Sequence, residues 1–520
     1  MTRAHHAVHG EGTVESWRRG GRVAVVRFES HPTPMPVPRS ELRLLDPPTN
    51  PGRVAFAKSK AVTGSYAKNR AALTLEAMRL GVVPETDLSA YTVGRDGALA
   101  AVDADLELVE ARGGAVRAFI GDYGSGKTHA LELTMQRALS KGYLTAIVTL
   151  DPNEAAPSHP KRVYRALMRT LRYPDRPSEE GAGIRPLLDA AIDCPTALEA
   201  FGVGRSQSAR SDESLAADEH LYLTPALTYH QNLGQAKSRA GTKQGNAAKN
   251  GKAAKRVKAG QQEELLQSAS ELLTDWLEGH PTISNQEIHS RLTGVSGKHP
   301  RLYSLCDYRP WARIYGYLLS GVSTLARAVG YAGLVVLLDE AEFYSLLSRE
   351  NRAHATHLFR AWTYAAVGDS APPDAEPLPF DESDIAMGGM GVLKRLPGRF
   401  GTAPGLYVVY AMTPTGEGDD GLSGAVPRDR RYRLKPLETP EYIELARRVC
   451  DFYASSRPDW ELPEAIIGPV GKVLAGLVRG GIVANPRQAM KFVIELLDVV
   501  RFKPSDLGPV IRGLQQQLSW

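Results

Sequence analysis

Cysteine is scarce in this 520-residue chain: Cys194, Cys306 and Cys450 lie far apart, without metal-ligand spacing. This excludes a small disulfide scaffold, and an odd, sparse count is typical of a reducing cytoplasm. Long hydrophobic runs are absent too. The longest mostly apolar run, Ala328 to Leu338, falls short of the ~20 residues that a membrane-spanning helix needs. Met1 to Gly12 is polar and lacks the apolar stretch of a secretory signal peptide. We therefore expect a cytoplasmic protein that does not span a membrane.

The composition is that of a chain that folds around a core, with 42% hydrophobic and 23% charged residues. At roughly 150 residues per domain, the length favours two to four domains. The net charge of +5 would say little about partners if it were spread evenly. It is not spread evenly.

The first 48 residues predict a small β-barrel, because short strand patterns and many prolines occur together there. Residues 9–14 open a first strand, Arg18 to Gly21 form a hairpin turn, and Arg22 to Phe28 form a second strand. The H-G-x-G-x-V opening resembles Tudor- and SH3-like modules. The alternative is a structural β-hairpin that binds nothing.

A phosphate-binding loop is the most specific motif: residues 121–128, Gly-Asp-Tyr-Gly-Ser-Gly-Lys-Thr, fit G-x-x-x-x-G-K-[ST]. An apolar strand over 115–120 precedes it and a helical pattern over 128–140 follows. Its glycines let backbone N–H groups point at phosphates, and the helix N-terminus adds partial positive charge. We predict that Lys127 reaches the β- and γ-phosphates of ATP and that Thr128 binds Mg²⁺. The predicted nucleotide-binding residues of this segment are Gly121, Asp122, Tyr123, Gly124, Ser125, Gly126, Lys127, Thr128 and His129.

An acidic pair follows the second buried strand of this site. Leu334 to Leu338 is continuously apolar, and Asp339 and Glu340 come directly after it. We predict that Asp339 holds the Mg²⁺ shell and that Glu340 orients and activates the attacking water. The alternative is an acidic strand cap. The two motifs lie more than 200 residues apart, so an insertion or subdomain must separate them.

Three further polar features are candidate site residues. Thr413 ends an apolar strand over 406–412, where it would lie between the two motifs and sense the γ-phosphate, or be merely structural. Arg487 opens a helix after Asn485-Pro486 and either reaches phosphate or stays solvated. An arginine cluster is usually a solvated face, but it could also supply a finger to a neighbouring subunit, and its members are Arg428, Arg430, Arg431 and Arg433.

The segment from Lys237 to Lys258 carries eight cations and no acidic residue, and Val257 is its only large apolar side chain. Such a run offers little to bury, so we predict that residues 205–262 are disordered or become ordered on a partner. Phosphate-rich DNA is the expected partner. The alternative is a solvated linker.

Taken together, these motifs resemble the ATP-binding proteins of BREX-type bacterial phage-defence systems, which belong to the AAA+ class of P-loop ATPases. The resemblance covers roughly residue 69 to the C-terminus and is carried by Val93-Gly-Arg95, the phosphate loop, Leu150-Asp-Pro152, 162–167 and L-L-D-E-A-E. It implies that Gly94 and Arg95 lie in the linker that borders the adenine, that Thr413 is at the first sensor position and that Arg487 is the second-sensor arginine. It also implies a helicase or other defence protein as partner, and a possible homo-oligomer. The barrel and the basic segment are not part of the family pattern.

We therefore predict an α/β fold with a P-loop, AAA+-type parallel sheet. The predicted parts are a barrel over 1–48, the first part of the core over 69–151, a mostly helical insertion over 152–330, the second part of the core over 331–440 and a helical lid over 441–520. The first functional hypothesis is an ATPase that couples nucleotide state to DNA engagement in a defence complex. The second is a STAND-like ATP switch that regulates proteins without binding nucleic acid. A substrate-modifying enzyme such as a kinase is a distant third, since no acceptor-site base is evident.

Overall fold

The computed structural model describes residues 2–6, 10–18, 23–28, 35–38, 42–44, 64–82, 87–176, 181–204, 219–249, 253–280, 288, 290–292, 302–303, 305–368, 396–414, 418–457 and 460–518. The chain forms two compact units, Met1–Ala55 and Phe56–Trp520. None of the described helices combines the length and the apolar character that crossing a membrane requires.

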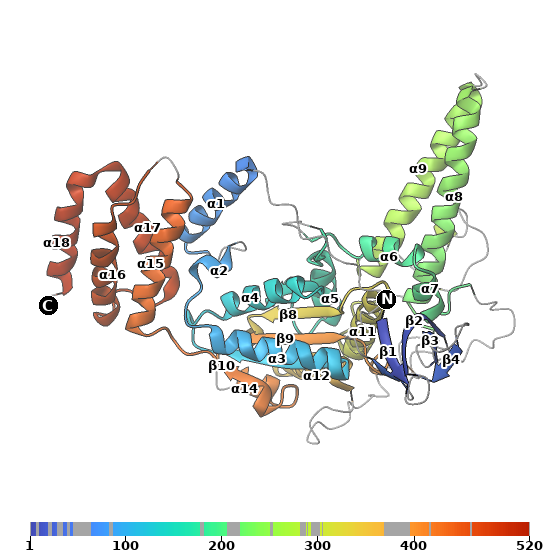
Figure 1. The fold of residues 1–520 in the computed structure, drawn as a ribbon, viewed down its shortest axis with the longest axis horizontal. Coiled ribbons are helices and arrows are strands. Elements are labelled where there is room, and N and C mark those ends of the chain that lie inside the picture. Colours follow the sequence, from blue (N-terminus) through green and yellow to red (C-terminus); the bar gives the residue numbers. More distant parts are fainter. Residues whose placement is uncertain are drawn as a thin grey trace. The chain divides into compact units, whose positions relative to one another are not determined.

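An antiparallel sheet makes up the described part of the first unit (Figure 1). β2 and β3 form the hairpin expected from the sequence, with a bulge between Val14 and Ser16 that bends β2. The described pairings do not show closure into a barrel, so the SH3- or Tudor-like character stays a prediction. In the spatial order β4-β3-β2-β1-β5, the strands are β4 (Met35–Pro38), β3 (Val23–Phe28), β2 (Gly10–Arg18), β1 (Thr2–His6) and β5 (Leu42–Leu44).

A five-stranded parallel sheet forms the centre of the second unit. In the order β10-β6-β9-β8-β7, its strands are β10 (Arg431–Arg433), β6 (Gly114–Ile120), β9 (Leu406–Met412), β8 (Leu334–Asp339) and β7 (Leu144–Thr149). β6, β8 and β9 are buried along their whole length, as parallel strands covered on both faces are. The expected α/β core with a parallel sheet is confirmed.

Helices cover both faces of this sheet, and alternate strand residues point to opposite cores. Val335 and Leu337 face the core that α3 and α4 cover, whereas Val336 and Leu338 face the core of the other helices. The helices of the first face are α3 (Asp96–Arg112) and α4 (Lys127–Ser140), and those of the second include α5 (Pro160–Arg169), α6 (Arg185–Ile192), α7 (Pro195–Ala200), α11 (Ala312–Ala328) and α12 (Arg349–Val367). The shorter helical segments are η2 (Arg309–Trp311), η3 (Ala341–Leu346), α14 (Gly418–Ser423), η6 (Arg428–Arg430) and η7 (Pro504–Asp506).

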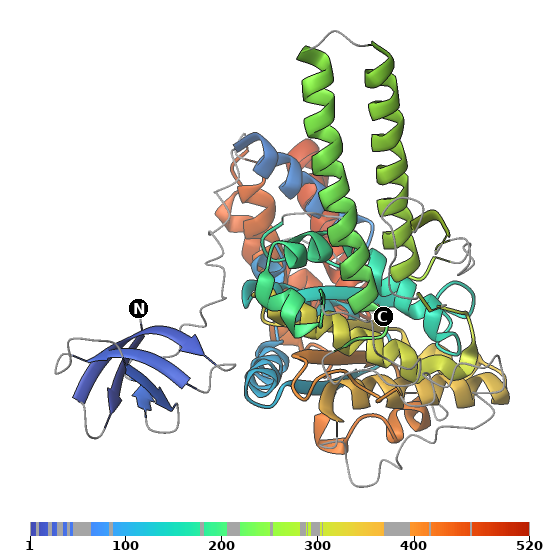
Figure 2. The same cartoon turned by 90° about the vertical axis from the view of Figure 1, so that its right-hand side faces the viewer.

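Two long helices, α8 (Leu223–Lys249) and α9 (Ala253–Leu277), pack against each other as a hairpin that extends away from the sheet (Figures 1 and 2). The structure differs here from the prediction of disorder over 205–262: residues 223–249 and 253–262 are helical, and 205–218 lie outside the described residues. Ala, Lys and Gln are good helix formers. Among the described side chains of the hairpin, those of Tyr229 and Leu273 at its base are fully buried.

His220 fixes the start of this hairpin. Its Nδ1 accepts hydrogen bonds from the N–H groups of Tyr222 and Leu223, each 3.1 Å away, and its ring stacks on Tyr317 with centroids 4.2 Å apart. These N–H groups at a helix N-terminus have no partner within the helix. Burial lowers the pKa of His220 to about 3, so the ring stays neutral and keeps accepting at Nδ1 near neutral pH.

A further helical layer, called the lid below, draws its helices from both ends of the second unit. Leu75 and Met78 of α1 are fully buried in its core, and Arg79 donates to Asp498 of α17 over 2.6 Å. The prediction assigned residues from 69 onward to the ATPase core, but α1 and α2 belong to the lid. The lid consists of α1 (Gly64–Arg79), α2 (Leu88–Tyr91), α15 (Thr439–Ser455), α16 (Glu464–Arg479), α17 (Pro486–Phe502) and α18 (Leu507–Leu518).

A buried ion cluster ties α3 to the sheet. Asp105 is fully buried and accepts from both Nε and a terminal nitrogen of Arg117, from Arg430 at 2.9 Å and from the Tyr407 hydroxyl at 2.7 Å. Arg431 donates to the carbonyl groups of residues 422 and 426. Arg430 and Arg431, two members of the arginine cluster considered as a finger, therefore bind groups within their own chain. The other two members, Arg428 and Arg433, are exposed.

We expect Asp105→Asn to lower the free energy of unfolding by about 3 kcal/mol or more, because it leaves Arg117 buried without its counter-charge. The matched control is Asp103→Asn on the same helix. Asp103 pairs with Arg137 and Lys141 near the surface, so its loss should cost less than about 1 kcal/mol. Denaturant unfolding followed by circular dichroism compares the two variants. Equal costs would show that the cluster contributes no more than a surface ion pair.

Candidate functional site

The loop between β6 and α4 needs glycine at two positions. Gly124 and Gly126 have φ of 80° and 87°, in the left-handed region. A Cβ at Gly124 would lie 2.7 Å from the Cβ of Asn485. α4 begins at Lys127, so the free N–H groups of its first turn face the loop. The loop is therefore shaped to hold an anion at a helix N-terminus.

Lys127 is buried, with 7% of its surface exposed, and its ammonium group points back across the loop. Nζ donates to the Gly121 carbonyl over 3.2 Å and to Thr413 Oγ1 over 2.7 Å. Its nearest described carboxylate is that of Glu342, with Oε1 3.9 Å from Nζ. The predicted phosphate lysine thus lies beside the predicted sensor threonine.

Thr128 and Asp339 meet although 211 positions separate them: Thr128 Oγ1 donates to Asp339 Oδ2 over 2.8 Å. Asp339 is the last residue of β8 and is buried. Burial raises the pKa of Asp339, while the hydrogen bonds from Thr128 and from the Glu340 N–H oppose that rise. The structure therefore brings together the two residues that were predicted as metal ligands.

Glu340 has a left-handed backbone with φ of 57°, a conformation that costs a non-glycine residue of order 1 kcal/mol or more. Its side chain lines the pocket described below. Burial, followed by the nearby charges of Glu342 and Asp339, raises the pKa of Glu340. The backbone turn at the end of β8 thus directs the predicted base toward the phosphate loop.

Thr413 follows β9, and β9 pairs with β6 on one side and β8 on the other. The strand that ends in the predicted sensor therefore lies between the strands that end in the phosphate loop and in the acidic pair. Because the carboxyl ends of parallel strands share one edge of the sheet, this order brings the three motifs together.

A pocket lies between the phosphate loop and the lid. Of the predicted residues, Arg95, Tyr123, Gly124, Gly126, Lys127, Thr128, His129, Glu340 and Arg487 line it. The other lining residues, which were not predicted as site residues, are Tyr91, Val93, Leu437, Leu445, Asn485, Pro486 and Met490.

The remaining predicted residues are not among those that line the pocket. Gly121 accepts from Lys127 through its carbonyl, and the Asp122 carbonyl accepts from the Ser125 N–H over 3.0 Å. Gly94 has φ of 66°, and a Cβ there would clash with Glu441. Gly94 is thus required by the left-handed backbone and the close approach of Glu441, and it does not line the pocket.

Arg95 lies against the phosphate loop. Its guanidinium group donates to the Ser125 carbonyl over 2.5 Å and to the Lys435 carbonyl over 3.2 Å. It is 5% exposed, and no described carboxylate lies within ion-pair distance of it. Burial lowers the pKa of Arg95, yet an arginine stays charged. The resemblance places this residue in the linker that borders the adenine, and that role stays a prediction.

The lid closes the pocket from the other side through the start of α17. Asn485 caps this helix by accepting from the Gln488 N–H over 3.1 Å, and Arg487 follows in the first turn, half-buried and lining the pocket. Because Asn485 also abuts Gly124, the lid and the phosphate loop are in direct contact.

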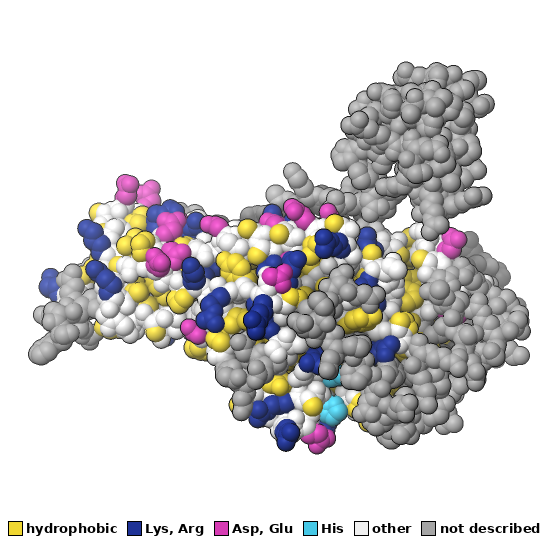
Figure 3. Space-filling view, turned by 90° about the horizontal axis from the view of Figure 1, so that it is seen from below, with side chains coloured by type: hydrophobic (Ala, Val, Ile, Leu, Met, Phe, Trp, Pro, Cys, Tyr) yellow, Lys and Arg dark blue, Asp and Glu magenta, His cyan; other side chains and the backbone are white. Residues whose placement is uncertain are grey.

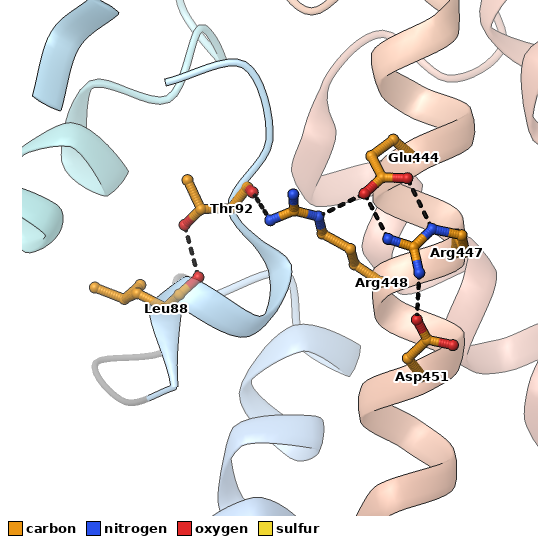
Figure 4. Close-up of polar contacts among 6 residues, drawn as sticks. All are labelled: Leu88, Thr92, Glu444, Arg447, Arg448 and Asp451. Carbon is orange, nitrogen blue, oxygen red and sulfur yellow. Dashed lines mark hydrogen bonds and ion pairs between the residues drawn. The ribbon is translucent and has the colours of Figure 1, made fainter. Parts of the chain in front are cut away.

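A polar network joins α15 of the lid to the segment before α3 (Figure 4). Arg448 donates to the Thr92 carbonyl and, through Nε, to Glu444, which also holds Arg447. The Thr92 hydroxyl lies 2.9 Å from Nε2 of His129 in the pocket wall. Burial lowers the pKa of His129 to about 4, so its ring is neutral near pH 7.

Glu342 is the site residue that sequence reasoning missed. It stands two positions after Glu340, in the run L-L-D-E-A-E, and its Oε1 accepts from Thr413 Oγ1. The only signal in the sequence was its place close behind the acidic pair. Asp339 ends β8, Glu340 is left-handed and the short helix η3 begins at Ala341, so no regular spacing predicts where the Glu342 side chain points.

The sheet order, the glycine loop at a helix N-terminus and the Thr128–Asp339 pair define a P-loop nucleotide-binding core. A family model for the BREX system ATP-binding protein BrxC/D matches residues 67–372, more than half of the chain, and the chain belongs to this family. A search of curated proteins finds no match. The resemblance inferred from the sequence is confirmed. Membership implies an ATP-binding role in a BREX defence system, alongside other proteins of that system.

Proposed function

We propose that the chain binds ATP with Mg²⁺ in the pocket between sheet and lid, hydrolyses it, and couples nucleotide state to DNA engagement in a BREX defence complex. The observation that carries the proposal is the convergence of Lys127, Thr128, Asp339, Glu340 and Thr413, from three distant segments, at one phosphate-binding loop.

The pocket has the two-sided chemistry that a nucleotide requires. One side holds the phosphate loop, Lys127 and Arg95, which suit a polyanion. The other is lined by apolar and aromatic side chains that suit a base, including Tyr91, Leu445 and Met490. The triphosphate would therefore lie along the loop with its base toward the lid.

The residues present also fit Mg²⁺. The Thr128 hydroxyl and the Asp339 carboxylate are hard oxygen donors 2.8 Å apart. Among the described residues, no group of three His, Cys, Asp or Glu side chains forms a metal site by itself, so water and phosphate oxygens would complete the shell. The bound ion would neutralise charge on the phosphates. Glu340 would orient the attacking water, and Lys127 and Arg95 would stabilise phosphate charge.

The hairpin of α8 and α9 is the proposed DNA contact. Seven of the eight cations between Lys237 and Lys258 lie on its two helices, and the sequence between these two lysines contains no acidic residue. On the face drawn in Figure 3, by contrast, the described Lys and Arg side chains are scattered among acidic and apolar ones. A helical arm with charge of one sign can neutralise phosphates along a strand or groove.

We expect Arg239→Gln, Lys243→Gln and Lys249→Gln together to weaken DNA binding and to flatten the slope of log K against log[salt] by about two to three units, since each lost duplex contact removes about 0.9. Glutamine preserves helix propensity, so the hairpin should stay folded. The measurement is a salt titration of DNA affinity by fluorescence anisotropy.

The matched control is a triple variant in the lid, Lys472→Gln, Lys491→Gln and Arg512→Gln, which removes three exposed cations of the same sign. It should leave the slope nearly unchanged. Superimposable lines for the hairpin variant and the parent protein would remove the hairpin as the DNA surface.

A second candidate is an ATP-dependent switch that regulates protein partners without nucleic acid. The contact of Arg448 with Thr92 beside the pocket favours it, because lid position would then follow nucleotide state. Steady-state ATPase with and without DNA separates the two functions. Several-fold stimulation supports the first, and an unchanged rate supports the switch.

A further inference from the structure

The carboxylate of Glu342 lies among the groups that would read the outer phosphate of ATP. Oε1 accepts from Thr413 Oγ1 and is 3.9 Å from Lys127 Nζ. The side chain is 14% exposed. A buried ammonium group needs a counter-charge, and Glu342 is placed to provide it.

Lys127, Thr413 and Glu342 form a directed chain of contacts. Lys127 Nζ donates to Thr413 Oγ1 over 2.7 Å, and Thr413 donates onward to Glu342. A hydroxyl group has a single proton to donate. Thr413 therefore cannot donate to Glu342 and to a phosphate oxygen at the same time.

The second oxygen of Glu342 indicates that the residue does more than pack. Oε2 is buried and receives no hydrogen bond from a donor group of the described residues, and the neighbouring carboxylate is that of Glu340, whose pKa is raised by burial and by Glu342. Buried polar atoms are nearly always paired, and an unpaired one costs free energy. A purely structural carboxylate would be expected to satisfy both oxygens.

We propose that Glu342 is a positioning residue that competes with the terminal phosphate of a nucleoside triphosphate for Thr413, and so sets the preference of the pocket between triphosphate and diphosphate. The inference rests on the proposed ATP binding. A diphosphate lacks the group that Thr413 would sense, so it can leave the contact between Glu342 and Thr413 intact. A triphosphate must break it.

The test is isothermal titration of the full chain with Mg²⁺–ATP and with Mg²⁺–ADP, for the parent protein and for Glu342→Gln. Glutamine keeps the size and an acceptor oxygen but removes the charge, and charge-assisted hydrogen bonds are about twice as strong as neutral ones. The affinity for ATP should rise about tenfold, and that for ADP should change less than about twofold.

Glu350→Gln is the matched control. Glu350 is an exposed carboxylate on α12 that pairs with Arg309, so its loss changes net charge equally without affecting nucleotide preference. Thermal melting without nucleotide checks folding. If the Gln variant does not fold, Glu342→Asp, which keeps the charge but withdraws it from Thr413, should shift the preference in the same direction.

An equal change of both affinities, or weaker ATP binding, would overturn the proposal and leave Glu342 a structural residue. If the parent protein binds ATP while the Glu342 variant gives one of these results, only the proposal about Glu342 fails, and the proposed ATP binding stands. If the parent binds neither nucleotide, both proposals fall.

Discussion

Lys127→Ala is expected to abolish tight ATP binding, with a loss of at least about a hundredfold. Lys127 supplies the ammonium group of the loop, and hydrogen bonds to charged groups contribute about 1.5–3 kcal/mol each. In the structure this group is buried and aimed across the loop at Gly121 and Thr413. Titration with a fluorescent ATP analogue measures the loss.

Lys141→Ala is the control for that result. Lys141 lies just after the other end of the same helix, 2.9 Å from Asp103, and away from the pocket. The Lys141→Ala variant should bind ATP as tightly as the parent protein does. Unchanged binding by Lys127→Ala would mean that the nucleotide lies elsewhere, and the proposed site would be wrong.

Glu340→Gln should keep ATP bound while slowing hydrolysis by about 10²–10⁴, the usual contribution of a positioned general base. The amide preserves the shape of the side chain at a strained turn, so loop geometry should survive. The readouts are ATP affinity and the single-turnover rate of phosphate release, measured on the same preparation.

Glu495→Gln is the matched control for this variant. Glu495 is exposed on α17, and its Oε1 lies 3.8 Å from Nζ of Lys491. The Glu495→Gln variant should therefore hydrolyse ATP at the rate of the parent protein. Hydrolysis at the parent rate by Glu340→Gln would instead remove Glu340 as the base. Glu342 would then be the next carboxylate to test.

Local patterns were enough for the parts of the site that lie within a few residues of each other. A glycine loop between a strand and a helix, and an acidic pair after an apolar strand, were both predicted from short spacings, and the structure has both features at one edge of the sheet. The position of Thr413 between them also followed, because parallel strands end at a shared edge.

The basic segment shows the limit of composition. Its lack of apolar residues predicted disorder, yet α8 and α9 extend through most of it. The helices gain their stability at the base, where Tyr229, Leu273 and His220 are buried, and the good helix formers beyond need only continue them. Helix propensity and a distant anchor outweighed the local shortage of side chains to bury.

The phosphate loop, the acidic pair and the parallel sheet could be predicted from the sequence, because these features depend on short-range spacing and strand burial. The contact of α1 with α17 in the lid, the ion pair of Arg430 with Asp105 and the hydrogen bond from Thr413 to Glu342 became visible once the chain was folded. Each of these contacts links residues far apart in the chain or depends on one backbone turn. Such contacts are decided by which apolar faces pack together and which buried charges find partners, and no local pattern carries that information.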